Sequence, residues 1–316
     1  MRLPQRFYRL PVRFNVERMR AEVAALPAEA WAPHPNGDPG NSALRLISVE
    51  GGDNEEVVGE MRMTRYLERS PYLRQVLASF GVVWSRSRLL RLAPGAVVPT
   101  HADIHHHWFY RVRMHVPIIT RPEVQFACDG ERVHMAAGEA WLFDNWRLHQ
   151  VENPSASERI HLVGDTSGNA AFWELAAQAD KPGSALSYRE FEPAECATPL
   201  TERALPRPVL PPPEVDLLIV DLRSELALER DAADERARLA RYHALLLGFG
   251  RDWRQAYALH GEDRSGWPEY AKLRDAVRER SRTASVGLVA RSNKVAAHRV
   301  LEARILRACL PFERAR

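Results

Sequence analysis

The sequence has only three cysteines, Cys128, Cys196 and Cys309, and no two of them form a CxxC pair. This spacing indicates neither a zinc knuckle nor a disulfide framework, so a reducing cytoplasm is the expected location. Long apolar runs are also missing, since no segment reaches the roughly 20 residues that a membrane-spanning helix needs. The first 15 residues carry charges and two prolines, which argues against a signal peptide.

An excess of charge of one sign is absent as well. The 44 basic and 41 acidic residues leave a formal net charge of +3. Because nucleic-acid-binding proteins usually carry a clear basic excess, no nucleic-acid partner is expected, and no membrane partner either. Hydrophobic residues make up 45% of the chain and charged residues 27%, as in soluble globular proteins. A chain of 316 residues has room for one substantial domain and a smaller one.

The segment from residue 87 to residue 163 has the pattern of a β domain. Short runs of β-forming residues alternate with turn signals such as Pro94-Gly95 and Asp129-Gly130. Many short strands at close spacing favour an antiparallel sandwich or jelly roll. Before this segment, helices are expected at 16–26 and at 64–80 with an interruption near Pro71, and a loop at 32–41. Strands are expected at 87–92, 110–118, 123–128, 132–135, 139–143, 150–152 and 159–163.

The last third of the chain has a different amino-acid composition. Pro206–Pro213 is rich in proline, which favours a semi-extended linker. The stretches 222–249 and 270–310 are rich in Ala, Leu, Arg and Glu at helical spacing. We therefore expect a β-rich domain over 1–180, a proline-rich linker over 181–213 and a helical domain over 214–316. The helical domain has no assigned role: capping the active site, forming a dimer, or docking a protein partner, carrier or peptide are equally open.

Three residues have the types and spacing of a metal site. His101 and Asp103 are two positions apart, and such residues point to the same side of an extended chain. His149, in a later strand or turn, would complete a set of two histidines and one carboxylate, which binds non-haem Fe(II) in oxygenases. The HxD pattern alone is weak, because a polar turn after Pro99 explains it equally well. His149 alone is also compatible with an ordinary core or surface histidine.

Two of the expected strands alternate polar and apolar side chains. The polar positions are Arg111, Arg113 and His115 in one strand and Arg159 and His161 in the other. A dianionic cosubstrate needs a fixed guanidinium, because arginine grips a carboxylate with two parallel hydrogen bonds. Arg159, ten residues after His149, is suitably placed. The alternative is that these arginines face solvent and pair with Glu123 or Glu139.

Residues 87–165 resemble the aspartyl/asparaginyl β-hydroxylase family of 2-oxoglutarate-dependent dioxygenases. The resemblance rests on four segments in family order: RLAPGAVVPTHAD (91–103), RVRMHVPIIT (111–120), GEAWLFDNWRLHQVEN (138–153) and ERIHLVGD (158–165). A weaker similarity extends back to about Arg2. The resemblance implies a mainly β fold, a double-stranded β-helix of the cupin-like jelly-roll type, with flanking N-terminal helices. It also implies Fe(II), 2-oxoglutarate as cosubstrate, and O2.

The resemblance also implies residue roles. His101, Asp103 and His149 would hold the iron, and Arg159 would bind the distal carboxylate of 2-oxoglutarate, with Arg113 and His115 as further contacts. Some animal members have glycine at the position of Asp103, so a full triad here is a departure from them.

The implied reaction is hydroxylation of an unactivated C–H of an amino acid or of an Asp/Asn-type residue in a peptide; a carrier-bound amino acid is a further substrate found in the family. Two other readings stay open: a metal-dependent, non-oxidative cupin enzyme, and a catalytically silent cupin binding module.

Overall fold

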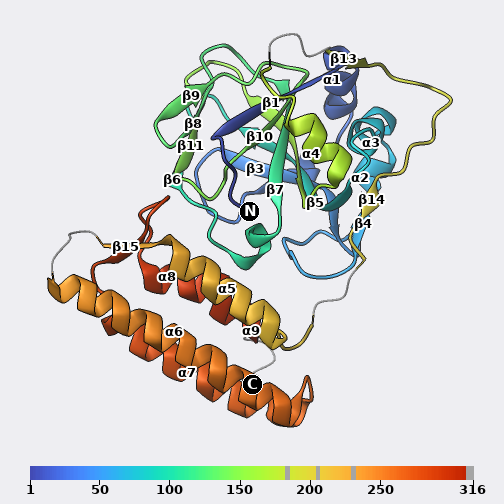
Figure 1. The fold of residues 1–316 in the computed structure, drawn as a ribbon. Helices are drawn as coiled ribbons and strands as arrows, with labels where there is room; N and C mark the ends of the chain where they lie inside the picture. The colour runs from blue at the N-terminus through green and yellow to red at the C-terminus, as the bar shows by residue number, and fades with distance from the viewer. Residues whose placement is uncertain (182–185, 204–206, 229–232, 311–316) are drawn as a thin grey trace. The chain divides into compact units, whose positions relative to one another are not determined.

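The computed structural model describes residues 1–181, 186–203, 207–228 and 233–310. The chain forms two compact units (Figure 1). Unit 1 comprises Met1–His101 and Tyr110–Leu205, and unit 2 comprises Ala102–Phe109 and Pro206–Arg316. The short segment 102–109 is therefore grouped with the C-terminal helices, although it follows a strand of unit 1 directly in the sequence.

Unit 1 contains a double-stranded β-helix made of a large and a small sheet, which confirms the predicted fold class. The large sheet runs in the order β13 (Ser187–Arg189), β1 (Phe7–Phe14), β10 (Glu139–Phe143), β7 (Val112–Ile119), β12 (Arg159–Thr166), β5 (Val83–Leu92), β3 (Asn41–Val49) and β2 (Ala32–Pro33), with β14 (Leu200–Thr201) beside β5 and β4 (Met61–Met63) beside β3. The small sheet runs in the order β6 (Val97–His101), β11 (His149–Glu152), β8 (Gln125–Cys128) and β9 (Glu131–Val133).

The large sheet is buried on both sides, and its two faces differ in chemistry. In β12 every residue is buried, yet Ile160 and Leu162 join the main hydrophobic core, whereas Arg159 and His161 alternate with them. Successive side chains of a strand point to opposite faces. One face, here called the outer face, therefore packs apolar side chains. The other, the inner face, meets the small sheet across an apolar cluster of Phe7, Leu92, Phe126, Cys128, Met135, Trp141, Phe143 and Val151.

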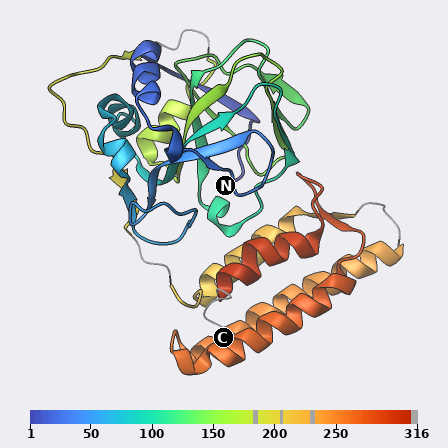
Figure 2. The ribbon, with the colours of Figure 1, turned by 180° about the vertical axis from the view of Figure 1, so that it is seen from behind.

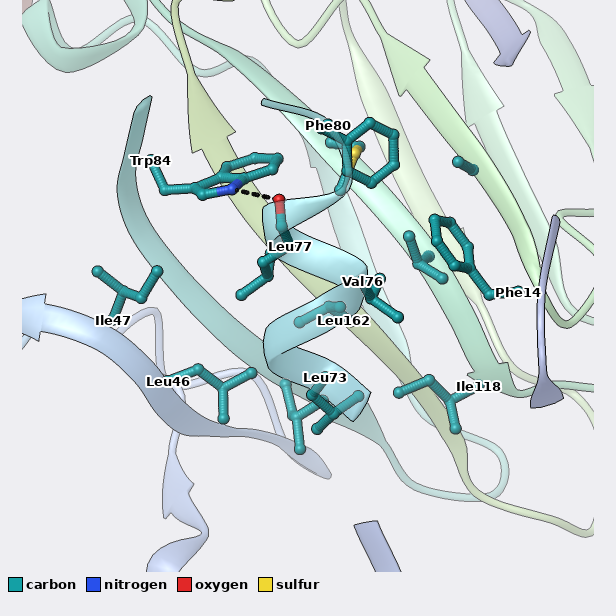
Figure 3. Close-up of a cluster of buried hydrophobic side chains, with 14 of the residues drawn as sticks. Phe14, Leu46, Ile47, Leu73, Val76, Leu77, Phe80, Trp84, Ile118 and Leu162 are labelled. Atoms are coloured by element: carbon teal, nitrogen blue, oxygen red, sulfur yellow. Dashed lines mark hydrogen bonds between the residues drawn. The ribbon is translucent and has the colours of Figure 1, made fainter. Parts of the chain in front are cut away.

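Helices cover the outer face. These are α1 (Val16–Ala24), α2 (Arg65–Glu68), α3 (Pro71–Ala78) and α4 (Ala170–Ala176), together with a 3-10 turn at Ala28–Ala30. Figure 3 shows α3 directing Leu73, Val76 and Leu77 into the core of the outer face. The indole Nε1 of Trp84 donates a hydrogen bond of 2.9 Å to the Leu77 carbonyl. This bond joins the end of the helix to β5.

The seven strands expected between residues 87 and 163 are present, with shifts of a few residues at their ends. Strands β1, β3 and β6 were not predicted. β6 is largely exposed and contains a proline, so it lacks the alternation of a half-buried strand. Residues of the predicted linker 181–213 also contribute β13 and β14 to the large sheet, while its residues 182–185 and 204–206 lie outside the described residues.

Unit 2 is helical and includes a small two-stranded antiparallel sheet. Its helices are α5 (Pro212–Glu225), α6 (Ala233–His260), α7 (Trp267–Ala284), α8 (Ala297–Leu301), the π-helical turn η4 (Glu302–Leu306) and α9 (Arg307–Cys309), with 3-10 turns at His106–Phe109 (η2) and Arg264–Gly266. β15 (Leu226–Leu228) pairs with β16 (Leu288–Ala290), which the helical pattern did not predict. Figure 2 shows α6 and α7 side by side.

The segment 102–109 packs within unit 2. Its turn η2 contacts η4, and the Arg304 guanidinium lies 5.5 Å from the ring centroid of Phe109. His107 and Trp108 are buried. Within the described ranges of the chain, no helix has the length and apolar character needed to cross a bilayer.

Candidate metal centre

His101 and His149 face each other across the small sheet. His101 is the last residue of β6 and His149 the first of β11, and the two are direct partners in the antiparallel register. Their ring centroids lie 4.2 Å apart. Forty-seven residues of sequence separate them, so this proximity is a product of strand pairing.

Asp103 joins the two histidines although it lies beyond the end of β6. One ligand atom each from His101, Asp103 and His149 lies within 4.8 Å of the other two. His149 is buried, whereas His101 and Asp103 are half-buried. Two imidazoles and one carboxylate on a β scaffold form the facial set typical of non-haem Fe(II), because three ligands on one side leave further coordination positions open.

Backbone hydrogen bonds fix the tautomer of both imidazoles. The Nδ1 atom of His101 lies 2.8 Å from the Pro99 carbonyl oxygen, and Nδ1 of His149 lies 2.9 Å from the Arg147 carbonyl oxygen. A carbonyl oxygen only accepts, so each Nδ1 carries the proton and donates. Each Nε2 then presents its lone pair, which is the form that binds a metal.

The turn before His149 and two aromatic rings hold this histidine in place. Asp144 accepts hydrogen bonds from the Trp146 amide at 3.2 Å and from Arg147 Nε at 3.0 Å. These bonds fix the turn that carries the Arg147 carbonyl, which supports a positioning role for Asp144. The ring of His149 is nearly parallel to that of Phe126 at 6.2 Å and meets Phe143 edge-on at 4.9 Å.

Arg159, His161 and His115 form a buried chain of contacts on the inner face. Arg159 Nη2 lies 2.8 Å from His161 Nδ1, and His115 Nδ1 lies 3.3 Å from the same atom. Burial and the nearby Arg159 charge hold the pKa of both His115 and His161 well below the ordinary histidine range. Both imidazoles are therefore neutral at physiological pH, and the positive charge resides on Arg159.

A small pocket adjoins this chain, lined by Thr120, Val124, Phe126, Met135, Val151, Arg159 and His161. Arg159 Nε, His161 Nε2 and Thr120 Oγ1 are buried and have no hydrogen-bond partner among the described residues. Buried polar atoms are normally paired. A ligand carboxylate would supply acceptors for these groups, so the residues present fit one carboxylate group of a cosubstrate. Phe126 also packs on His149, which connects the pocket to the metal centre.

The alternative of solvent-facing arginine pairs does not hold for Arg159 or Arg113. Arg159 is only 3% exposed. Arg113 pairs with the buried Asp165 at 3.2 Å, and neither Arg113 nor His115 lines the pocket. Their role toward 2-oxoglutarate stays a prediction. Sequence reasoning did not assign Thr120 and His161 to the site, although the alternation of His161 with Arg159 was a usable signal.

Parts of the chain are similar to known proteins. Residues 15–167 match the family model described as aspartyl/asparaginyl beta-hydroxylase. A curated relative, L-proline cis-3-hydroxylase 1 from Streptomyces sp, is 26% identical over 166 residues, which cover 48% of this chain and 56% of the relative. The match thus spans little more than half of that relative's length.

Two solved structures show partial similarity. An oxidoreductase of the 2OG-Fe(II) oxygenase family from Burkholderia pseudomallei has a TM-score of 0.37 at 17% identity, over 49% of this chain and 78% of its own. A Pseudomonas putida prolyl-4-hydroxylase has a TM-score of 0.35 at 15% identity, over 53% of this chain and 95% of its own. The matched segment 15–167 contains His101, Asp103 and His149, and it is similar to the aspartyl/asparaginyl β-hydroxylase family.

Proposed function

We propose that the protein is an Fe(II)- and 2-oxoglutarate-dependent dioxygenase that hydroxylates an unactivated C–H of an amino acid or of an Asp/Asn-type residue in a peptide. The observation that carries the proposal is the convergence of His101, Asp103 and His149 within 4.8 Å, beside a pocket with three buried polar atoms that lack partners. The family match and the hydroxylase relative support the same reaction class.

In this proposal the three ligands hold Fe(II) through two Nε2 atoms and one carboxylate. With 2-oxoglutarate and O2, such a centre supplies the oxidising power for C–H hydroxylation. Arg159, His161 and Thr120 bind and orient the distal carboxylate of the cosubstrate. Phe126 and Phe143 fix the His149 ring, and the apolar cluster around them excludes water from the site.

The substrate is proposed at the level of its class, and the relative's name supplies a first compound to try. L-Proline should be tested beside other free amino acids and beside short peptides that contain Asp or Asn. The assay follows succinate formation by anaerobically iron-loaded protein after addition of 2-oxoglutarate and O2. We expect succinate to form only with Fe(II), and one member of the panel to increase its rate.

A negative result in the succinate assay would favour one of two other classes of protein. Well-folded, iron-loaded protein that consumes no 2-oxoglutarate with any panel member would contradict the proposal and favour a non-oxidative cupin enzyme. Protein that binds no divalent metal at all would instead favour a silent binding module. Metal content and succinate therefore need to be measured on the same sample.

A further inference from the structure

Three arginines of the large sheet converge on one carboxylate. Glu55 Oε1 accepts a hydrogen bond of 2.8 Å from Arg45 Nε. Its Oε2 accepts from Arg88 Nη1 at 3.0 Å and from Arg86 Nη1 at 3.4 Å. We call Arg45, Arg86 and Arg88 the arginine cradle.

The cradle is rigid and buried, whereas its occupant comes from a loop. The side chains of Arg45, Arg86 and Arg88 are 10%, 11% and 4% exposed, and all three project from the paired strands β3 and β5. Glu55 is 23% exposed and lies in the segment 50–60, between β3 and β4, which contains no helix or strand. The strands thus present a preformed anion site, and the loop supplies the anion.

Further charged side chains lie beside the cradle. Arg113 adds a fourth guanidinium, with Asp165 between it and Arg86 at 3.2 and 3.8 Å. The carboxylates of Glu55 and Asp165 are shielded from solvent. Asp53, which pairs with Arg45, is 84% exposed and is screened by water. Burial, reinforced by Arg86 and Arg113, lowers the pKa of Arg88 to about 9. A buried cationic site of this kind favours a bound anion.

The cradle lies on the inner face, close to the metal centre. Arg88 pairs in register with Val163, and Val163 with His115. The ring of Phe143 lies 5.5 Å from that of His115 and 4.9 Å from that of His149. On the other side, Arg88 Nη1 lies 3.4 Å from His34 Nε2. Burial first, and then Arg88, Arg113, Arg86 and His101, lower the pKa of His34 to about 3. His34 is thus within electrostatic reach of both the cradle and a metal ligand.

We propose that Arg45, Arg86 and Arg88 form the binding site for a carboxylate of the substrate, and that Glu55 occupies this site until the substrate displaces it. The inference rests on the proposed function and specifies it: the substrate carries a carboxylate, which the cradle grips while the C–H to be oxidised faces the metal. Arg159 and its pocket remain available to the cosubstrate, because they lie at a different part of the inner face.

Two sources of the carboxylate fit the cradle: the α-carboxylate of a free amino acid and the side chain of an Asp residue in a peptide. Matched probes separate them. L-Proline and L-prolinamide differ in the α-carboxylate, and N-acetyl-aspartate amide and N-acetyl-asparagine amide differ in the side-chain carboxylate. Isothermal titration of full-length, Mn(II)-loaded protein with each probe, in the presence of 2-oxoglutarate, measures binding without turnover.

Glu55→Gln is the decisive variant, because it predicts a gain that misfolding does not produce. Removing the competing carboxylate should tighten binding of the preferred carboxylate probe by about fivefold to tenfold, as expected for one charge-assisted contact. The amide probes should be unaffected. Glu56→Gln makes the same change one residue away, on an exposed side chain, and should leave all four dissociation constants unchanged.

Arg45→Met should have the opposite effect on binding of the carboxylate probe. It should weaken binding of the carboxylate probe by about tenfold or more, while the dissociation constant of 2-oxoglutarate stays within about twofold because Arg159 is intact. Circular dichroism and the thermal midpoint establish that the variant is folded.

The proposal is overturned if carboxylate and amide probes bind alike, if no carboxylate binds to wild type or to Glu55→Gln, or if Glu55→Gln and Glu56→Gln behave identically. Succinate formation is scored separately. Selective carboxylate binding without any succinate would reject the dioxygenase assignment and keep the cradle. Succinate formation without selective carboxylate binding would reject the cradle as the substrate site and keep the dioxygenase assignment.

Discussion

The two faces of the large sheet are equally buried but chemically opposite. Leu162 and Ile160 on the outer face pack against helices, while Arg159 and His161, their immediate neighbours in β12, are buried as well, at 3% and 2% exposed. Burying apolar groups stabilises the fold, whereas burying a guanidinium costs free energy unless it is paired. The inner face therefore departs from what folding alone favours, and such departures are typical of functional sites. The comparison predicts that outer-face changes damage stability and inner-face changes damage binding.

The largest effect is expected at the metal centre. His149→Ala removes a ligand whose ring is buried and oriented by the Arg147 carbonyl, so Fe(II) binding and succinate formation should both fall to background. Metal content by mass spectrometry and succinate by chromatography provide the two readouts. Gln150→Ala, one position along β11, is the control and should keep both. Normal turnover by His149→Ala would refute the metal assignment.

Leu162→Ala examines the outer face. The side chain is fully buried in the main core, so the variant should lose about 2–5 kcal/mol of unfolding free energy through lost burial and a residual cavity. Urea denaturation measures this loss. The Michaelis constant for 2-oxoglutarate, determined on the folded fraction, should stay near wild type. A large change in that constant would mean that the two faces are not functionally separate.

Arg159→Met is the inner-face counterpart, three residues from Leu162 in the same strand. Methionine fills much of the volume without the charge, so unfolding free energy should change little or rise. Loss of a charged hydrogen bond to the cosubstrate should raise its Michaelis constant about tenfold to a hundredfold. Titration of 2-oxoglutarate in the succinate assay gives the value. An unchanged constant would remove Arg159 from the cosubstrate site.

The smallest effect concerns pH. Above pH 6.5, His34 is neutral in both the folded and the unfolded chain and contributes nothing. Below that, the unfolded chain takes up a proton, but the folded one does not until pH approaches its pKa of about 3. As the pH is lowered below 6.5, the free energy of unfolding should therefore fall by up to about 1.4 kcal/mol per pH unit. His34→Gln should flatten this slope between pH 6.5 and 5 in denaturant titrations, and parallel curves for the two proteins would contradict the assignment.

Local sequence patterns predicted more of the outer fold than of the inner face. Helices α1 and α3 and seven strands follow from apolar periodicity and turn residues, which act over a few positions. The partnership of His101 with His149 depends on strand register across 47 residues, and only the family resemblance indicated it. Arg45 and Arg88 were not singled out from the sequence, because nothing in their neighbours reveals that Glu55 of the loop at 50–60 pairs with them.

Because residues 102–109 belong to unit 2, the chain crosses between the two units three times. The chain leaves unit 1 after His101, returns at Tyr110 and leaves again after Leu205, so no single peptide bond separates the two units. Truncation after residue 205 would leave Trp108 and Phe109 without the C-terminal helices that they pack against. The C-terminal helices are thus needed to pack the segment 102–109. A graft of residues 206–316 onto another protein of this family would have to bring these eight residues with it.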